Sequence, residues 1–184
     1  MINPSVNLRG FSLVEMVATI VVLGIALVTI TSMMSSSLSS NANTYEETRT
    51  TALARAYLDE ILSRRYDENS HPSGAPACDG IAGARPCTIV FGTESGEGTR
   101  DKWDDVDDYH GLDEGEGGVL LELHDAENNV RSGYQGYRVS VFVEYAGDQS
   151  PINKELTDAK LITVTIYSPL DSVGTEFQVY KANF

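Results

Sequence analysis

Basic residues are scarce in this chain of 184 residues, which has 13 Lys and Arg against 27 Asp and Glu and a formal net charge of −14. Nonspecific nucleic-acid binding takes its affinity mainly from Lys and Arg on phosphates. The composition therefore argues against nucleic acid as a partner. The excess of acid instead predicts an exposed domain that repels its own copies and stays in solution.

Cysteine is almost absent too, with only Cys78 and Cys87 in the chain. There is no CxxC motif, and the nearest histidines, His71 and His110, stand at no recognisable ligand spacing, so no metal centre is expected. The two cysteines lie nine positions apart in a stretch rich in Gly, Ala and Pro. An oxidising compartment would join them in a disulfide, and a pair of reduced thiols is the alternative.

Catalytic motifs are missing as well, since GxSxG, HExxH and a phosphate-binding loop do not occur. His71, His110 and His124 stand in polar or turn-rich contexts, which predicts surface positions rather than general bases. The serines of residues 35–40 indicate a membrane exit and not a nucleophile. The chain is therefore not expected to be an enzyme, and no cofactor is expected.

Charged residues are also missing from Met16–Met34, a run of nineteen residues. As a helix this run would span about 28 Å, close to the roughly 30 Å of a bilayer's hydrocarbon core. Glu15 stands at its start, where a carboxylate costs about 2.5–3.5 kcal/mol on insertion. Glu15 therefore predicts a positively charged partner in an apolar environment. Arg9 precedes the run and Glu46 and Glu47 follow it, and because basic residues favour the cytoplasmic side, most of the chain is predicted to be exported.

The segment that contains Arg9, Gly10, Phe11 and Glu15 resembles the cleavage and methylation signal of type IV prepilins and pseudopilins. The resemblance implies a leader, residues 1–10, that a prepilin peptidase removes by cutting between Gly10 and Phe11. It also implies that the new amino group of Phe11 is methylated and that Glu15 is an assembly contact with a neighbouring subunit. Ser32 stands where major pilins often have proline, which argues against a major subunit.

The chain order predicts an α+β, pilin-like fold, in which a long N-terminal helix packs on a C-terminal antiparallel sheet. Residues 11–34 are the transmembrane or filament-core part of the helix, and residues 35–66 are its amphipathic second half. Residues 35–43, rich in Ser and Asn, are either helical or bent. Residues 67–118 are a variable loop region with the cysteine pair, and residues 119–184 form the sheet.

Periodicity supports this division. Leu53, Tyr57 and Ile61 recur at helical spacing and form one apolar stripe, with Leu58 and Leu62 beside it. Four runs are strand-like, because they alternate or are continuously apolar and are separated by turn residues. They are Val119–His124, Tyr137–Tyr145, Leu161–Tyr167 and Phe177–Tyr180. The stripe is the expected cover for the apolar face of the sheet.

An acidic stretch, residues 101–111, suggests calcium at the Asp104–Asp108 loop, because clustered carboxylates suit a hard cation. The stretch does not fit the EF-hand template, since no glycine falls at the sixth position. The favoured interpretation is a solvated acidic loop with Trp103 and Tyr109 packed inward. Two short runs, residues 107–111 and 180–184, are similar to D-type minor pilins of the mannose-sensitive haemagglutinin (MSHA) pilus.

These resemblances imply a structural subunit, a minor type IV pilin. It would first be held in the bacterial inner membrane, with its C-terminal domain in the periplasm, and would then be assembled into a pilus for surface attachment. Its implied partners are the prepilin peptidase, other pilin subunits through the N-terminal helix, and the inner-membrane assembly platform. A minor pseudopilin of a type II secretion system is the alternative. A periplasmic protein with an ordinary signal peptide or anchor is a third hypothesis, since Ser37-Leu38-Ser39 offers small residues for a general signal peptidase.

Overall fold

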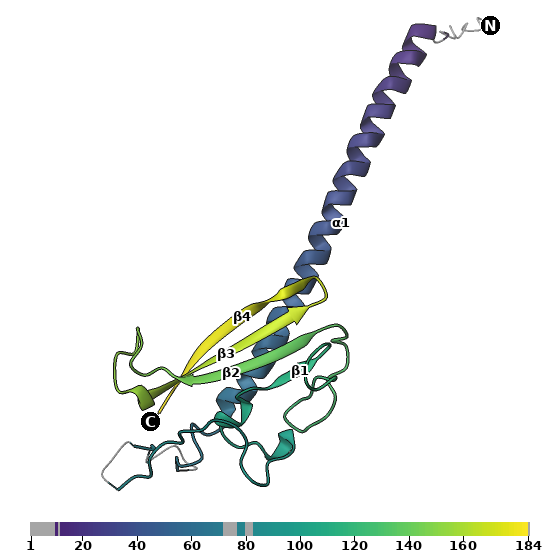
Figure 1. The fold of residues 1–184 in the computed structure, drawn as a ribbon. Coiled ribbons are helices and arrows are strands. Elements are labelled where there is room, and N and C mark those ends of the chain that lie inside the picture. Colours follow the sequence, from purple (N-terminus) through teal and green to yellow (C-terminus); the bar gives the residue numbers. More distant parts are fainter. Residues whose placement is uncertain (1–9, 11, 72–76, 80–82, 184) are drawn as a thin grey trace, which may run out of the picture. The chain divides into compact units, whose positions relative to one another are not determined.

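A computed structural model describes residues 10, 12–71, 77–79 and 83–183. The chain divides into two compact units, residues Met1–Tyr45 and Glu46–Phe184. Helix α1 (Leu13–Ser63) contributes to both units. The predicted α+β layout is confirmed, because the part of α1 in the second unit packs on an antiparallel sheet (Figure 1).

The helix is continuous through the Ser- and Asn-rich stretch of residues 35–43, so the bent alternative for this stretch is wrong. Hydroxyl groups along the helix bond back to carbonyl groups of the preceding turn, as Thr44 Oγ1 does to the Ser40 carbonyl at 3.0 Å. Polar side chains satisfied in this way are compatible with a helix.

Helix α1 ends at Ser63, before the predicted Tyr66. The last turn tightens, with the Arg64 amide donating to the Ile61 carbonyl at 3.1 Å. Lys181, near the C-terminus of the chain, donates from Nζ to the Leu62 carbonyl at 3.0 Å and also to the Arg64 carbonyl. A cation from a distant segment thus satisfies carbonyl groups that any helix end leaves free.

The sheet consists of strands β1 (Asp113–Gly115), β2 (Arg138–Tyr145), β3 (Ala159–Ser168) and β4 (Asp171–Ala182) in the order β1-β2-β3-β4, and all pairs are antiparallel (Figure 1). The three later strands confirm the runs predicted around residues 137–145, 161–167 and 177–180.

The predicted strand Val119–His124 is wrong. This segment makes only isolated bridges, between Leu120 and Glu114 and between His124 and Val130, and the edge strand is the acidic segment β1 instead. Val119 and Leu121 each expose 81% of their surface, whereas Leu123 is buried in the core, so only part of this apolar run is used to fill it.

The core lies between the predicted stripe of α1 and one face of the sheet. Leu53, Tyr57 and Ile61 are fully buried, whereas Leu62 is on the exposed side of the helix. The alternating residues that meet them are Val139, Val141 and Val143 of β2 and Ile162, Val164 and Ile166 of β3. Removal of this apolar surface from water is the main contribution to the stability of the second unit.

Three short 3-10 helices, η1 (Arg100–Lys102), η2 (Asp107–Tyr109) and η3 (Leu156–Asp158), interrupt the connecting segments. The chain just after α1 pairs with the segment before η2: the Arg65 amide donates to the Asp104 carbonyl at 3.0 Å, and the Val106 amide donates to the Arg65 carbonyl at 3.1 Å. This pairing brings the acidic loop to the end of the helix.

Candidate functional site

The N-terminal candidate site consists of the start of α1 and the residues before it. Gly10 is exposed and precedes the helix, and Phe11 lies outside the described residues. Glu15 is in the first turn of α1, where the helix dipole favours a carboxylate, and it is exposed to solvent. The Met16 amide donates to the Ser12 carbonyl at 3.1 Å, so the hydrogen-bond ladder begins at Ser12.

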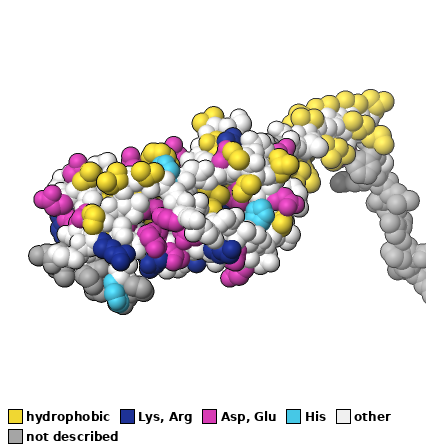
Figure 2. Space-filling view, turned by 60° about the horizontal axis from the view of Figure 1, so that its bottom comes forward, with side chains coloured by type: hydrophobic (Ala, Val, Ile, Leu, Met, Phe, Trp, Pro, Cys, Tyr) yellow, Lys and Arg dark blue, Asp and Glu magenta, His cyan; other side chains and the backbone are white. Residues whose placement is uncertain are grey.

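Behind Glu15, no charged residue occurs before Glu46. The large apolar side chains from Leu13 to Met34 that the structure describes are more than half exposed, and α1 is long and apolar enough to cross a membrane. Hydrophobic side chains cover the visible side of this segment in Figure 2. An apolar surface of this kind is unfavourable in water and calls for a bilayer or other apolar helices around it.

The predicted disulfide between Cys78 and Cys87 is confirmed. Both cysteines are buried and form a small cluster with Tyr66. Asn183 ties the C-terminus to this cluster, since Nδ2 donates to the carbonyl groups of Cys78 at 2.8 Å and Thr157 at 3.1 Å. A crosslink that closes so short a loop contributes about 2.5–3 kcal/mol on the chain-entropy model.

The acidic loop is mostly buried, which corrects the prediction, and only Asp104 of the Asp104–Asp108 loop is exposed. Asp105 and Asp107 are fully buried, and Asp108 is only 2% exposed. The cause is local pairing with the backbone: Asp105 Oδ1 accepts the Asp107 amide at 2.6 Å, and Asp108 Oδ2 accepts the Asp104 amide at 2.9 Å. Tyr109 is fully buried as predicted, and Trp103 packs edge-on against it at 4.9 Å between ring centroids.

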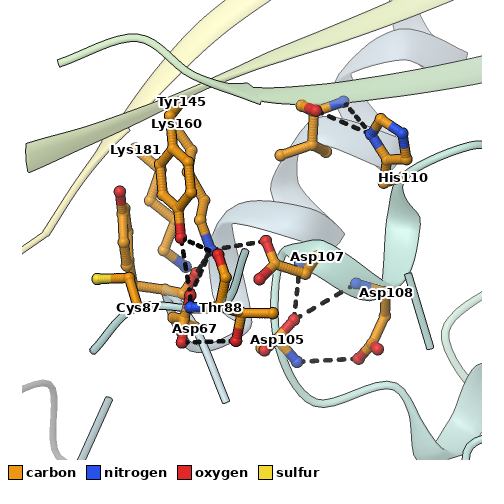
Figure 3. A network of polar contacts seen from close by, with 12 residues as sticks. Asp67, Cys87, Thr88, Asp105, Asp107, Asp108, His110, Tyr145, Lys160 and Lys181 are labelled. Carbon is orange, nitrogen blue, oxygen red and sulfur yellow. Dashed lines mark hydrogen bonds and ion pairs between the residues drawn. The ribbon is translucent and has the colours of Figure 1, made fainter. Parts of the chain in front are cut away.

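A buried lysine compensates part of this charge. Lys160 is fully buried, and its Nζ lies 2.6 Å from Asp107 Oδ1, 3.1 Å from Asp67 Oδ2 and 2.7 Å from the Tyr66 carbonyl oxygen. Figure 3 shows the amino group between the two carboxyl groups, beside Tyr145. We call Lys160, Asp67, Asp107 and Tyr145 the Lys160 cluster. It joins three distant segments: the chain after α1, the η2 turn and the sheet.

The two carboxyl groups of the Lys160 cluster are in opposite environments. Burial by itself would raise the pKa of Asp67, but Lys160 and the amide groups of Asn69 and Thr88 outweigh it and hold that pKa below its usual value. Burial raises the pKa of Asp107 to about 7, against the opposing effect of Lys160. Asp67 is therefore the stable carboxylate and Asp107 the readily protonated group.

A second buried network surrounds Arg100, which is 3% exposed. Its Nε lies 2.8 Å from Glu60 Oε1 and its Nη1 lies 3.2 Å from Glu114 Oε1. The Arg100 guanidinium also stacks near the rings of Tyr57, Trp103 and Tyr109, at 5.2, 5.0 and 4.9 Å from their centroids. Burial and the Glu60 carboxylate raise the pKa of Tyr109 to about 12, which keeps its hydroxyl as a donor to Glu60 at 2.9 Å. We call Arg100, Glu60 and Glu114 the Arg100 cluster.

Two of the three histidines are not the surface residues that the sequence predicts. His110 is half-buried, its Nδ1 lies 2.8 Å from the Val143 carbonyl oxygen, and its ring lies 4.9 Å from that of Phe142. His124 Nδ1 lies 3.3 Å from Glu114 Oε2. His71 is exposed, as predicted. Each partly buried histidine is fixed by a neighbour from another segment.

Three groups of carboxylate or cysteine side chains among the described residues lie close enough together to be considered as metal ligands. Asp67 lies near both cysteine sulfurs, but these are joined to each other and are not thiolate ligands. In the group of Glu68, Asp104 and Asp105, the Arg65 guanidinium already pairs with the first two residues. A third group, Glu94, Glu97 and Asp108, has suitable spacing but no further feature that points to an ion.

Sequence reasoning missed Lys160 and Arg100. A signal for Lys160 was present: it lies two positions before Ile162 and continues the inward-facing series of Ile162, Val164 and Ile166. A lysine at an inward position of a strand needs a buried counter-charge. For Arg100, in an irregular Gly- and Asp-rich segment, the sequence has no corresponding periodic signal.

The buried acidic loop predicts a pH dependence of stability. Burial raises the pKa of Asp108 to about 7, whereas an unfolded aspartate titrates near about 3.9. The folded state binds the proton more tightly, so the contribution of Asp108 is fully present below pH ~4 and is lost as the pH rises through 7. We expect the free energy of unfolding to fall by about 1 kcal/mol between about pH 6 and pH 8 from this group.

Urea unfolding at both pH values measures this effect. Asp108→Asn, which keeps an acceptor oxygen for the backbone amides, is expected to have a smaller loss of stability over this interval than the unchanged protein. Equal losses in the two proteins would show that Asp108 does not titrate in this range.

Compared with known proteins, the chain matches no family model, no curated protein and no solved structure. Function is therefore inferred from the residues of this chain. Both polar clusters hold segments of the second unit together. The exposed start of α1, with Glu15, is the feature most directly suited to an external partner.

Proposed function

We propose that this protein is a minor type IV pilin subunit of the MSHA type, which is assembled into a pilus used in surface attachment or primes its assembly. The observation that carries the proposal is Glu15, an exposed carboxylate in the first turn of α1. A charge-free run, residues 16–45, follows it, and Arg9, Gly10 and Phe11 stand shortly before it. A helix that only anchors the protein gains nothing from this carboxylate. In a subunit of a helical bundle, the carboxylate can set the axial position relative to the neighbouring subunits.

The proposed pathway begins in the bacterial inner membrane, with the helix in the bilayer and the domain of residues 46–184 in the periplasm. A prepilin peptidase cuts between Gly10 and Phe11 and methylates the new amino group. An assembly platform in the inner membrane then moves the helix from lipid into the filament core. There Glu15 faces the amino group of a neighbouring subunit, and because a buried charge is tolerable only when paired, this contact selects one axial offset.

The organisation of the second unit supports such a transfer. The buried core that the structure describes lies within residues 46–184, so the domain can stay folded while the helix changes its surroundings. Acidic side chains are spread over the visible surface of this unit in Figure 2 and favour solubility after export. Ser32, in place of the proline frequent in major pilins, favours a minor subunit.

The N-terminus of the mature protein tests the proposal. We expect mass spectrometry of protein recovered from sheared surface filaments to identify N-methylated Phe11 as the first residue. Gly10→Leu should block this processing, because a peptidase that requires a small residue before the cut cannot accept leucine. Gly24→Ala is the matched control, since a side chain at this helical glycine meets no neighbour within 4 Å, and it should be processed normally.

Other outcomes would overturn parts of the proposal. A mature chain that begins near Ser40 indicates an ordinary signal peptide, and an intact Met1 indicates an uncleaved anchor. Correct processing without recovery from surface filaments, together with a defect in protein secretion when the chain is deleted, indicates a pseudopilin of a type II secretion system.

A further inference from the structure

The Lys160 cluster contains an amine and a carboxyl group in direct contact inside the protein. Lys160 and Asp107 both have side chains with 0% exposure, and Nζ lies 2.6 Å from Oδ1. The contact does not have hydrogen-bond geometry, and neither carboxyl oxygen of Asp107 has a hydrogen-bond partner among the described residues. Apart from the ion-pair contact with Lys160, this carboxyl group therefore has no described donor that would stabilise it as an anion, and it is held against a potential nucleophile.

Asp67 on the other side of the amine is in the reverse situation. Its two oxygens accept hydrogen bonds from the amides of Asn69 at 2.9 Å and Thr88 at 3.0 Å, and from the hydroxyl groups of Thr88 and Tyr145, each at 3.1 Å. These donors stabilise the carboxylate in place, 3.1 Å from Lys160 Nζ. When two titratable groups have environments that separate their proton affinities in this way, they are suited to opposite roles, base and acid.

The surroundings of the amine are apolar and aromatic. The rings of Tyr66, Tyr145 and Phe91 lie with their centroids 4.4, 5.3 and 5.4 Å from Lys160 Nζ. Exclusion of water disfavours hydrolysis of a product formed there. The backbone also fixes the contact, because Asp105 Oδ1 accepts the Asp107 amide and β3 holds Lys160 between β2 and β4.

We propose that Lys160 and Asp107 form an intramolecular isopeptide bond after the protein has folded, with Asp67 as the general base. Asp67 takes one proton from the lysine ammonium, and the free amine attacks Cγ of protonated Asp107. The C–N bond forms and the C–OH bond breaks, and a second nitrogen proton passes through Asp67 to the leaving hydroxyl group, which departs as water. The third proton stays on the amide nitrogen and Asp67 keeps the first, so no oxidant or co-reactant is required.

The bond would link the η2 turn to β3, one of the two inner strands of the sheet. Such a crosslink restricts the unfolded chain, as a disulfide does, and it resists reduction. Together with Cys78–Cys87 it would fix the irregular segment between α1 and β1 at two points. The inference is independent of the proposed function, because it concerns only the interior of residues 46–184.

Mass spectrometry of the full chain, purified and denatured, tests the bond directly. We expect an intact mass lower by one water than that of the disulfide-bonded sequence. Trypsin cannot cut after an amidated Lys160, so the digest should contain residues 103–131 joined to residues 155–181. Free peptides 155–160 and 161–181 in full yield, with an unchanged intact mass, would overturn the proposal without any need for a variant.

Substitutions test the role of each residue in the proposed reaction. Lys160→Met and Asp107→Ala should remove the linked peptide entirely. Asp67→Asn keeps the shape but removes the base and should slow linking at least about a hundredfold, which is the usual effect of a lost general base. Asp105→Asn is the matched control, a fully buried loop aspartate that can still accept the Asp107 amide, and it should link as the unchanged protein does. Equal linking in Asp67→Asn and the control would rule out Asp67 as the base.

Discussion

Replacement of Glu15 by leucine is expected to give a protein that is processed and stays in the membrane but is missing from sheared filaments. The substitution removes the only charge between Ser12 and Tyr45, so insertion into the bilayer becomes easier. Cleavage after Gly10 should continue, because the signal there lies mainly in Gly10 and Arg9. Assembly should fail, since the amino group of the neighbouring subunit loses its partner and a buried unpaired charge costs about 3–5 kcal/mol.

Thr19→Leu is the matched control for this experiment. Thr19 lies one turn further along α1, and its hydroxyl group donates to the Met16 carbonyl within the same helix at 2.8 Å, so it too is a polar residue in the apolar segment. Immunodetection in membrane and filament fractions should place the control in both. If Glu15→Leu enters filaments as well as the control does, Glu15 is not an assembly contact and the proposed pilin function loses its main physical support.

Replacement of Arg100 by methionine is expected to destabilise the domain of residues 46–184 by about 3–5 kcal/mol, because it leaves buried carboxylates without their counter-charge. Glu60 and Glu114 are 8% and 0% exposed, and Arg100 is a partner of both. Arg131 and His124 each keep contact with one of these carboxylates but are themselves partly exposed. A loss of this size is a large part of the total stability of a domain.

Urea unfolding of the 46–184 domain, followed by circular dichroism, measures this loss. Arg138→Met is the control: Arg138 also pairs with a carboxylate through two nitrogens, at 2.6 and 2.7 Å from Asp113, but its side chain is 35% exposed. Exposed ion pairs contribute about 1 kcal/mol or less. Similar losses of unfolding free energy in the two variants would mean that burial does not determine how much the Arg100 cluster contributes to stability.

The parts of the fold that were predictable depend on local periodicity. The stripe of Leu53, Tyr57 and Ile61 and the alternation in β2 and β3 each lie within one segment, and each is confirmed by burial. A helix or strand with one apolar face has few ways to hide it, so pattern and structure agree. The disulfide was also predictable from the sequence, because its cysteines are close in sequence and the chain has no other cysteine.

Strand β1 could not be predicted in the same way. It is short and acidic, and its pairing depends on Gly115, which has a φ of +101° and lies so close to β2 that a side chain would collide with the Tyr137 carbonyl. Its central residue, Glu114, is fully buried because Arg100 meets it. Strand propensity does not reflect either contact. The more apolar run of Val119–His124 is therefore the one that the sequence favours as a strand.

Local sequence patterns specify the apolar helix with Glu15 in its first turn, the helix stripe, the main strands and the cysteine pair. Which charges are buried depends instead on contacts between distant segments. An aspartate without a partner is normally exposed to water. Asp107 is buried beside Lys160, which comes from a strand far along the chain. A buried charge is tolerable only next to a counter-charge, and nothing in the local sequence of either partner specifies the other, so folding must bring them together before their environment is defined.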